Sequence, residues 1–227
     1  IVPFFRGNWK SFTKLAHCTM KALAKYREKF FEDWYQFDGK LFFVILSLLY
    51  IVVLILKRMF VLDTIAAFEI IQERGEMWVF DLFFGLQYFS IPFFLAWKFT
   101  ITAFLLWVGC FLFGYRVTYA QLWRWVMFSD LIFLFAEFFK FIWLLLDASD
   151  PTYQDIVAFY PLSLINMVDY NALPDRWHYP FKALNLFEPI YWFALMVGVF
   201  YLSKKKWSIS VAIVSVSYIL FFFIWLG

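Results

Sequence analysis

The sequence predicts an all-α, polytopic helical membrane protein with about five transmembrane helices and an amphipathic N-terminal helix. Composition is the first observation: of 227 residues, 64% are hydrophobic, 26% are aromatic and only 16% are charged, whereas about 25% of a soluble domain is charged. The second observation is that long apolar runs recur, and a helix crossing about 30 Å of hydrocarbon needs about 20 such residues. We therefore expect a cytoplasmic segment at residues 1–38 and a membrane domain at residues 39–227.

The N-terminal segment is basic and amphipathic. Residues 11–37 place apolar side chains near helical spacing and lysines elsewhere on the helical wheel, which indicates a helix on the membrane surface or against a partner helix. The first forty residues contain eight Lys and Arg, and such residues concentrate in the cytoplasm. The pattern does not resemble a nucleic-acid-binding arm.

The first predicted span covers residues 41–56, between Lys40 and the Lys57-Arg58 pair, and residues 59–62 or 34–37 could extend this short run. Residues 59–76 mix apolar and acidic side chains at helical spacing. They are too charged to cross the bilayer, so we expect an interfacial helix there. Gly75 is the predicted end of that helix.

Residues 77–115 allow two interpretations. One is a helical hairpin that turns at Lys98, and the other is a single tilted span at residues 91–113 preceded by an interfacial aromatic stretch. Residues 97–99 contain no Gly, Asn or Asp to form a turn, which favours a continuous helix through Lys98. Pro92 would start or kink that helix.

Three further spans are predicted at residues 125–146, 189–202 and 209–226. Pro189 suits the first turn of a helix, where its missing N–H has no cost. Residues 148–188 are predicted to lie in the interface on the outer side. There we expect one helix from Pro151 to Tyr160 and another from Pro161 to residue 167 or 168. The headgroup-level anchors should be Trp177, His178 and Tyr179.

The charges of the loops test the number of spans. Five spans place residues 116–124 and the lysines at 204–206 in the cytoplasm, and the acidic stretch 147–188 outside. Six spans would place the lysines at 204–206 outside and the acidic stretch 147–188 in the cytoplasm. Five fits the cytoplasmic preference of Lys and Arg better, although Lys57 and Arg58 would then lie outside. We expect an integral membrane protein with a cytoplasmic N-terminus, in a bacterial inner membrane or a eukaryotic endomembrane.

Four charged residues fall inside predicted spans: Lys98, Asp130, Glu137 and Lys140. Asp130 and Glu137 are seven residues apart and so share a helix face, and Lys140 follows Glu137 at i+3, close enough for an ion pair. Lys98 could pair with either acid. Because one charge at the bilayer centre costs about 2.5 to 3.5 kcal/mol, we expect pairing.

These charges have two interpretations. They could form a proton or ion relay or a polar substrate path. They could equally form a structural cluster that sets helix register or marks a subunit interface. The chain contains only eight Gly and no Gly-xxx-Gly pair, whereas transport cores use broken helices and small residues at contacts. The structural interpretation is therefore favoured.

No catalytic residue, metal site or cofactor is predicted. His17 and His178 are the only histidines, and they fall on opposite predicted sides of the membrane. They therefore cannot combine in a metal site or activate a serine together. The sequence also has no glycine-rich phosphate loop and no Cys-x-x-Cys pair.

Two stretches resemble the Yip family of five-span, Rab-interacting-type membrane proteins, which includes bacterial members. One is FGYRVTY at residues 113–119, which leads into residues 121–134. The other is LNLFEPIYW at residues 184–192, followed by residues 195–202 and a basic turn. Gly114 stands alone where the family has a glycine pair, and Ser129-Asp130 stands where it has a proline. The resemblance implies a cytoplasmic N-terminus, five spans and no catalysis.

The predicted function is a non-enzymatic scaffold or accessory subunit of a larger membrane assembly. Its partners would be the lipid bilayer and protein subunits or further copies of the chain. The alternative is a transporter or proton-coupled component that uses the intramembrane charges. A third hypothesis is a lipid-modifying enzyme at the outer interface, which would depend on His178 or an outer carboxylate.

Overall fold

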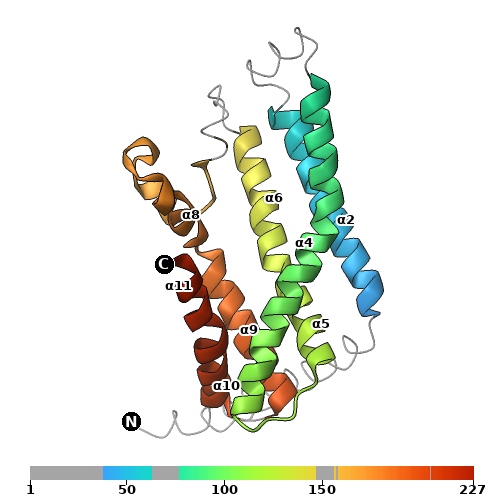
Figure 1. The fold of residues 1–227 in the computed structure, drawn as a ribbon, viewed down its shortest axis with the longest axis vertical. Helices are drawn as coiled ribbons and strands as arrows, with labels where there is room; N and C mark the ends of the chain where they lie inside the picture. The colour runs from blue at the N-terminus through green and yellow to red at the C-terminus, as the bar shows by residue number, and fades with distance from the viewer. Residues whose placement is uncertain (1–37, 63–76, 147–155, 157, 205) are drawn as a thin grey trace, which may run out of the picture. The chain divides into compact units, whose positions relative to one another are not determined.

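The computed structural model describes residues 38–62, 77–146, 156, 158–204 and 206–227, and these form helices joined by turns (Figure 1). The chain divides into two units, Ile1–Phe42 and Phe43–Gly227. The described part of the first unit is the start of helix α2, and all other described residues belong to the second unit. The predicted N-terminal helix, residues 63–76 and almost all of the predicted Pro151 helix lie outside the described residues.

Three of the described helical segments are long and apolar enough to cross a membrane: Gly39–Val61, Trp78–Leu112 and Trp207–Leu226. The all-helical membrane class predicted from composition therefore agrees with the structure. The first segment comprises α2 (Gly39–Lys57) and the π-helical turn η1 (Arg58–Leu62), and it matches the span predicted at residues 41–56. Residues 59–62 continue this helix, which is one of the two extensions that the sequence allows, and the rest of the predicted interfacial segment 59–76 lies outside the described residues.

Helix α4 (Met77–Leu112) is a single helix of 36 residues. It runs unbroken through Lys98, so the hairpin interpretation is wrong. Pro92 lies inside the helix and does not start it, and the aromatic stretch before it belongs to the same helix. At 1.5 Å per residue, α4 is about 54 Å long. A proline is tolerated inside such a helix where neighbouring groups satisfy the freed carbonyl.

The third predicted span is divided into α5 (Tyr119–Ser129) and α6 (Leu131–Leu146). Asp130 lies between them, yet its N–H donates to the carbonyl of Val126 and its own carbonyl accepts from Leu134. The two helices therefore form one nearly continuous rod that begins earlier than predicted. Gly114 adopts a φ of +77° in the turn before α5, a conformation that favours glycine.

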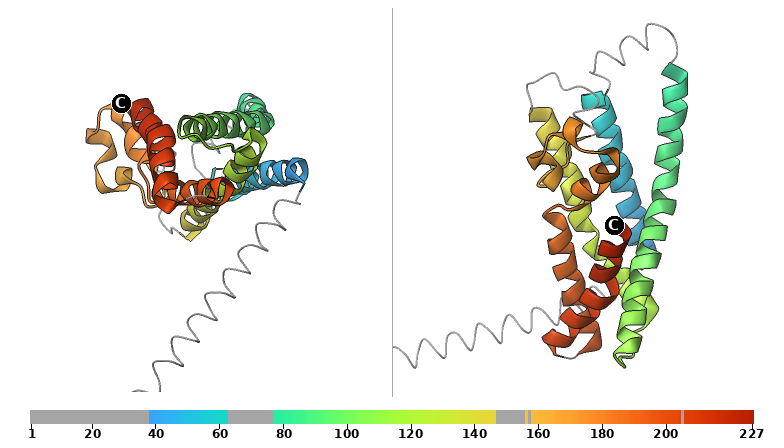
Figure 2. Two further views of the ribbon diagram at one scale, coloured as in Figure 1. Left: turned by 90° about the horizontal axis from the view of Figure 1, so that it is seen from below. Right: turned by 60° about the vertical axis from the view of Figure 1, so that its left-hand side comes forward.

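The last two predicted spans correspond to a helical hairpin. Helix α9 (Phe187–Ser203) has Pro189 in its first turn and ends at Lys204, whose φ is 52°. The return segment consists of α10 (Trp207–Val214), the π-helical turn η4 (Ser215–Ile219) and α11 (Leu220–Leu226). Figure 2 shows the two arms side by side.

Glycines mark two close helix crossings. The indole of Trp125 on α5 lies directly over Gly198 of α9, where an added Cβ would be 1.9 Å from Trp125 Nε1. That nitrogen donates a hydrogen bond of 2.8 Å to the carbonyl of Ala194. At the other crossing, Gly109 of α4 packs against Ser217, with 2.8 Å between its ideal Cβ and that of Ser217.

The segment before α9 differs from its prediction. Pro161 does not open a helix; two 3₁₀ turns, η2 (Leu164–Met167) and η3 (Tyr170–Ala172), precede the unpredicted helix α8 (Asp175–Ala183). Ser163 Oγ accepts from the N–H of Ile165 at 3.1 Å, so Ser163, not Pro161, caps the first turn. Within the second unit, the turns that follow α4 and α9 lie at one end, and α8 lies next to the opposite end of α9 (Figure 1).

Candidate functional site

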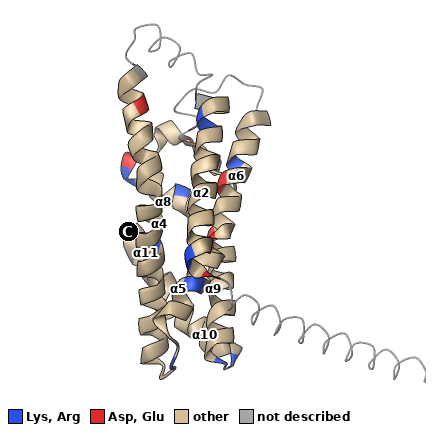
Figure 3. Cartoon of the chain, turned by 90° about the vertical axis from the view of Figure 1, so that its right-hand side faces the viewer, with Lys and Arg blue, Asp and Glu red and all other residues tan. Residues whose placement is uncertain are grey.

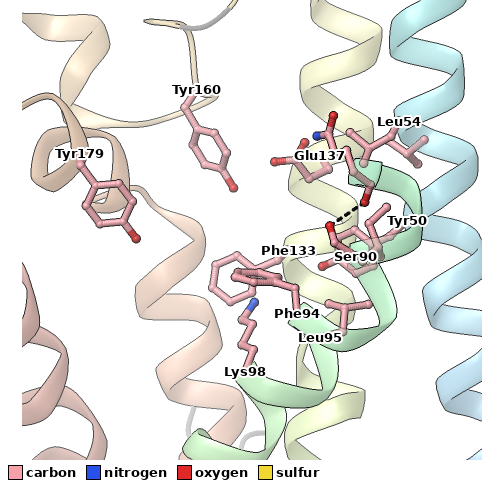
Figure 4. A pocket seen from close by; sticks show the side chains of 13 residues that line it. Tyr50, Leu54, Ser90, Phe94, Leu95, Lys98, Phe133, Glu137, Tyr160 and Tyr179 are labelled. Atoms are coloured by element: carbon pink, nitrogen blue, oxygen red, sulfur yellow. Dashed lines mark hydrogen bonds between the residues drawn. The ribbon is translucent and has the colours of Figure 1, made fainter. Parts of the chain in front are cut away.

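The candidate site is a pocket of about 530 Å³ between α2, α4 and α6, bordered on a fourth side by Tyr160 and α8 (Figure 4). Its volume falls in the range of about 300 to 1,000 Å³ that is usual for small-molecule sites. Most of its wall is aromatic or aliphatic, and two charged side chains face it. The lining residues are Tyr50, Val53, Leu54, Gln87, Ser90, Ile91, Phe94, Leu95, Lys98, Phe133, Glu137, Tyr160 and Tyr179.

At one end of the pocket, Lys98 of α4 forms an ion pair with Asp130. Lys98 Nζ lies 2.5 Å from Asp130 Oδ1, and the hydroxyl of Tyr50 donates to Oδ2 at 2.9 Å. Lys98 Nζ also lies 4.1 Å from the ring centroid of Phe133, a favourable cation–π distance. Asp130 is fully buried, and a donor on each oxygen satisfies its charge.

A second ion pair lies farther along the same helices, where Lys57 of α2 pairs with Glu137 of α6. Tyr50 and Lys57 are seven residues apart, as are Asp130 and Glu137. The Tyr50–Asp130 hydrogen bond is therefore followed, two helical turns along, by the Lys57–Glu137 ion pair. Together they hold α2 alongside the α5–α6 rod. Figure 3 shows acidic and basic residues beside one another along the helices.

A third ion pair joins Arg58 of η1 to Asp81 of α4. The guanidinium carbon of Arg58 also lies 4.4 Å from the ring centroid of Phe84. Asp81 is 54% exposed in this pair, so the pair is far less buried than the one at Asp130. Lys57 and Arg58 are the two basic residues that the five-span prediction places on the outer side. In the structure both residues form ion pairs with acids of neighbouring helices.

Of the four predicted intramembrane charges, the structure brings together Lys98 and Asp130, as one of the two predicted options. It does not pair Lys140 with Glu137. Lys140 Nζ donates to the carbonyls of Ile156 and Phe159 at 2.9 and 2.6 Å. Glu137 instead turns toward α2. The i+3 spacing was compatible with an ion pair, but the tertiary fold supplies each side chain with a different partner.

The three predicted interfacial residues lie on α8. Trp177 and Tyr179 are exposed, whereas His178 is held by its surroundings. Its ring stacks on Tyr170, with centroids 4.0 Å apart, and its Nε2 lies 3.1 and 3.0 Å from the carbonyls of Tyr170 and Leu173. An Nε2–H donor fits both acceptors. This geometry gives His178 a structural role and lends no support to the hypothesis of a lipid-modifying enzyme.

Several residues of the site were missed from sequence. In the sequence, Tyr50 and Tyr160 stand among apolar residues and look like ordinary core positions. The one available signal was that Tyr50 and Lys57 have the same seven-residue spacing as Asp130 and Glu137, their partners in the structure. Burial raises the pKa of Tyr160 and, less strongly, that of Tyr179, so both phenols keep their protons. Neither hydroxyl forms a hydrogen bond with another described residue.

A second polar group lies on α9, where Glu188, Tyr191 and Trp192 share one helix face. Within the described chain, Glu188 Oε2, the Tyr191 hydroxyl and Trp192 Nε1 are buried and have no partner at ordinary hydrogen-bond geometry, although the Tyr191 hydroxyl interacts with the side chain of Thr102. Trp192 interacts with the carboxyl group of Glu188, but not with ordinary hydrogen-bond geometry. The ring of Tyr191 contacts Phe133, with centroids 4.9 Å apart, so this face adjoins the pocket wall.

The described residues contain no group of three or more His, Cys, Asp or Glu side chains that could hold a metal ion. The chain matches no protein-family model, no curated protein and no solved structure. The resemblance to the Yip family therefore stays a prediction that depends on the two sequence stretches.

Proposed function

We propose that this chain is a five-span integral membrane protein that acts as a non-enzymatic scaffold or accessory subunit, with its N-terminus in the cytoplasm. The observation that carries the proposal is the length of the exposed apolar surface on α4. Large hydrophobic side chains are exposed from Trp78, near its first residue, to Leu112, its last.

This surface is longer than the hydrocarbon layer. A helix of about 54 Å exceeds a layer of about 30 Å, and a tilt of about 40°, the upper end of the usual range, still leaves about 40 Å along the membrane normal. Part of the exposed apolar face of α4 therefore extends beyond the lipid tails. An apolar partner segment would cover it at the least cost. The exposed aromatic residues include Phe83, Phe89, Phe93 and Trp97.

The charge pairing supports the same proposal. Lys98, Asp130, Lys57 and Glu137 join three helices through contacts that are complete within the protein. Such pairs fix helix register and need no further ion. A scaffold requires this kind of fixed interhelical geometry.

The five-span topology combines the three long segments with the α5–α6 rod and α9. Helix α9 has 17 residues, the lower limit of about 17 to 25 for a spanning helix. The turn at Gly114 and the turn at Lys204 lie at one end of the second unit, and α8 lies next to the opposite end of α9 (Figure 2). This arrangement agrees with basic turns in the cytoplasm and α8 outside.

Site-specific photocrosslinking tests the scaffold proposal. A benzophenone amino acid replaces Phe83 on α4 or, as the control, Ile224 on α11; the two side chains are 65% and 68% exposed. Irradiation of intact membranes should produce a discrete protein adduct, or a dimer of the chain, from position 83 and only lipid adducts from position 224. Lipid adducts alone at position 83 would refute a partner on α4.

The second candidate is a transporter or proton-coupled component, because Lys98 and Glu137 both face the pocket. Its test is proton flux into proteoliposomes, followed with an enclosed pH-sensitive dye. Flux by the wild-type protein that disappears in Asp130→Asn and Glu137→Gln, at unchanged protein insertion, would support this candidate. Absence of flux in the wild type, or full flux in both variants, would exclude proton coupling through these acids.

A further inference from the structure

The pocket has a chemistry that the scaffold proposal does not use. Its two charged side chains already have counter-charges inside the protein, since Lys98 pairs with Asp130 and Glu137 pairs with Lys57. A charged ligand would therefore find no spare opposite charge there and would have to break one of these pairs. The pocket is suited to a molecule without net charge.

Four polar groups of the lining can still donate a hydrogen bond. The hydroxyls of Tyr160 and Tyr179 point into the pocket (Figure 4), and neither is used by another described residue. Lys98 carries three N–H groups and gives one to Asp130, while Gln87 adds an amide. Tyr160 and Lys98 are half-buried, whereas Tyr179 and Gln87 are more exposed. A polar group in an apolar surrounding is stabilised by a hydrogen-bond partner, so the expected ligand offers acceptors such as carbonyl oxygens.

The walls indicate the shape of the ligand. Five aromatic side chains line the pocket, from α2, α4, α6, the segment before η2, and α8: Tyr50, Phe94, Phe133, Tyr160 and Tyr179. Aromatic walls favour a flat ring, which can stack on or meet their edges. The aliphatic side chains of Val53, Leu54, Ile91 and Leu95 complete an apolar lining that suits a hydrocarbon tail.

We propose that the pocket between α2, α4 and α6 binds an uncharged, lipid-soluble quinone. Its ring lies among the aromatic side chains and its carbonyl oxygens accept hydrogen bonds from Tyr160, Tyr179 and Lys98. This inference is independent of the scaffold proposal, because it concerns the isolated chain and needs no partner protein.

The test uses the full chain in lipid nanodiscs and a photoreactive azide of a 1,4-benzoquinone that carries one isoprene unit. Labelling should saturate, should be displaced by the unmodified quinone, and should fall on peptides that contain residues 50–54, 87–98, 133–137 or 160–179. Labelling that does not saturate, or that falls elsewhere, would overturn the proposal.

Conservative variants test the hydrogen bonds. Tyr160→Phe and Tyr179→Phe should each weaken displacement by roughly fivefold, the effect of one lost hydrogen bond. The control is Tyr119→Phe, because the hydroxyl of Tyr119 donates to the carbonyl of Thr100 outside the pocket. The affinity of this variant for the quinone should equal that of the wild type. Equal affinity in all three variants would refute the proposed donors.

A competitor without a ring tests the class of ligand. Monoolein is an uncharged lipid with an ester carbonyl, and it should displace the label far less well than the quinone. Equal displacement would show that the pocket accepts any neutral lipid ester and would overturn the assignment to quinones. If a phenylalanine variant fails to fold, the site of labelling and the competition in wild-type protein still decide the question.

Discussion

At the scale of single residues, Asp130 is the centre of the buried polar contacts. It lies between α5 and α6, has no exposed surface, and receives Lys98 from α4 and Tyr50 from α2. Four elements therefore meet at one carboxylate. The sequence predicted a partner for Asp130 because an isolated charge is costly in a membrane. It could not predict Tyr50, because a tyrosine in an apolar run carries no sign of its partner.

Lys98→Met should destabilise the protein by about 3 to 5 kcal/mol, because it leaves Asp130 buried without its cation. The double variant Lys98→Met/Asp130→Asn should recover much of this loss, since the uncompensated charge is gone. Thermal unfolding in detergent, followed by circular dichroism, measures both effects. The control is Asp81→Asn, which breaks a pair whose acid is 54% exposed and should cost about 0 to 1 kcal/mol.

A melting temperature for Lys98→Met equal to that of the wild type would contradict the assigned role of the pair. So would a double variant that is less stable than Lys98→Met alone.

At the scale of elements, the crossing of α5 and α9 depends on the absence of a side chain at Gly198. The Trp125 ring occupies the space where a Cβ would lie, and its indole N–H donates to the carbonyl of Ala194. The sequence showed an isolated glycine without a Gly-xxx-Gly pair and so gave no reason to expect a close crossing. The close approach arises here between one glycine and one large ring on a different helix.

Gly198→Ala should destabilise the protein by about 1 to 3 kcal/mol, because the new methyl group forces the Trp125 ring or the helix to move. Gly85→Ala is the matched control, since nothing lies within 4 Å of an ideal Cβ at that position of α4. It should be neutral or stabilise the helix by about 0.5 to 1 kcal/mol. Melting temperatures in one detergent compare the two variants, and equal losses in both would contradict this account of the crossing.

At the scale of the whole molecule, the question is which side of the membrane each turn occupies. The basic turns at residues 113–118 and around Lys204 lie at one end of the second unit, and α8 lies next to the opposite end of α9 (Figure 1). The sequence predicted this grouping from loop charges alone.

Cysteine labelling of intact cells tests the orientation. In a Cys18→Ser background, a cysteine at Asn171 should react with a membrane-impermeant maleimide from outside. Cysteines at Tyr115 or Lys204 should react only after the membrane is opened. The native Cys110 is fully buried and should give little background. Labelling of position 204 from outside would favour the six-span arrangement and contradict the five-span proposal.

The sequence by itself determined the class of this protein, because composition and the length of apolar runs report the solvent that the chain must occupy. It also located the helices at residues 41–56, 189–202 and 209–226, and it favoured a continuous helix through Lys98 because residues 97–99 lack a turn former. These are local properties, and they depend on neighbours along the chain.

Only the tertiary structure decided which groups meet. Glu137 pairs with Lys57 across helices, and Lys140 binds backbone carbonyls of the following segment, although Glu137 and Lys140 are neighbours on one helix face. The pocket likewise brings together Tyr50 and Tyr179, which are 129 residues apart in the sequence. The physical reason is that a buried charge takes the partner that the packing of helices brings within reach, and sequence spacing describes only one helix at a time.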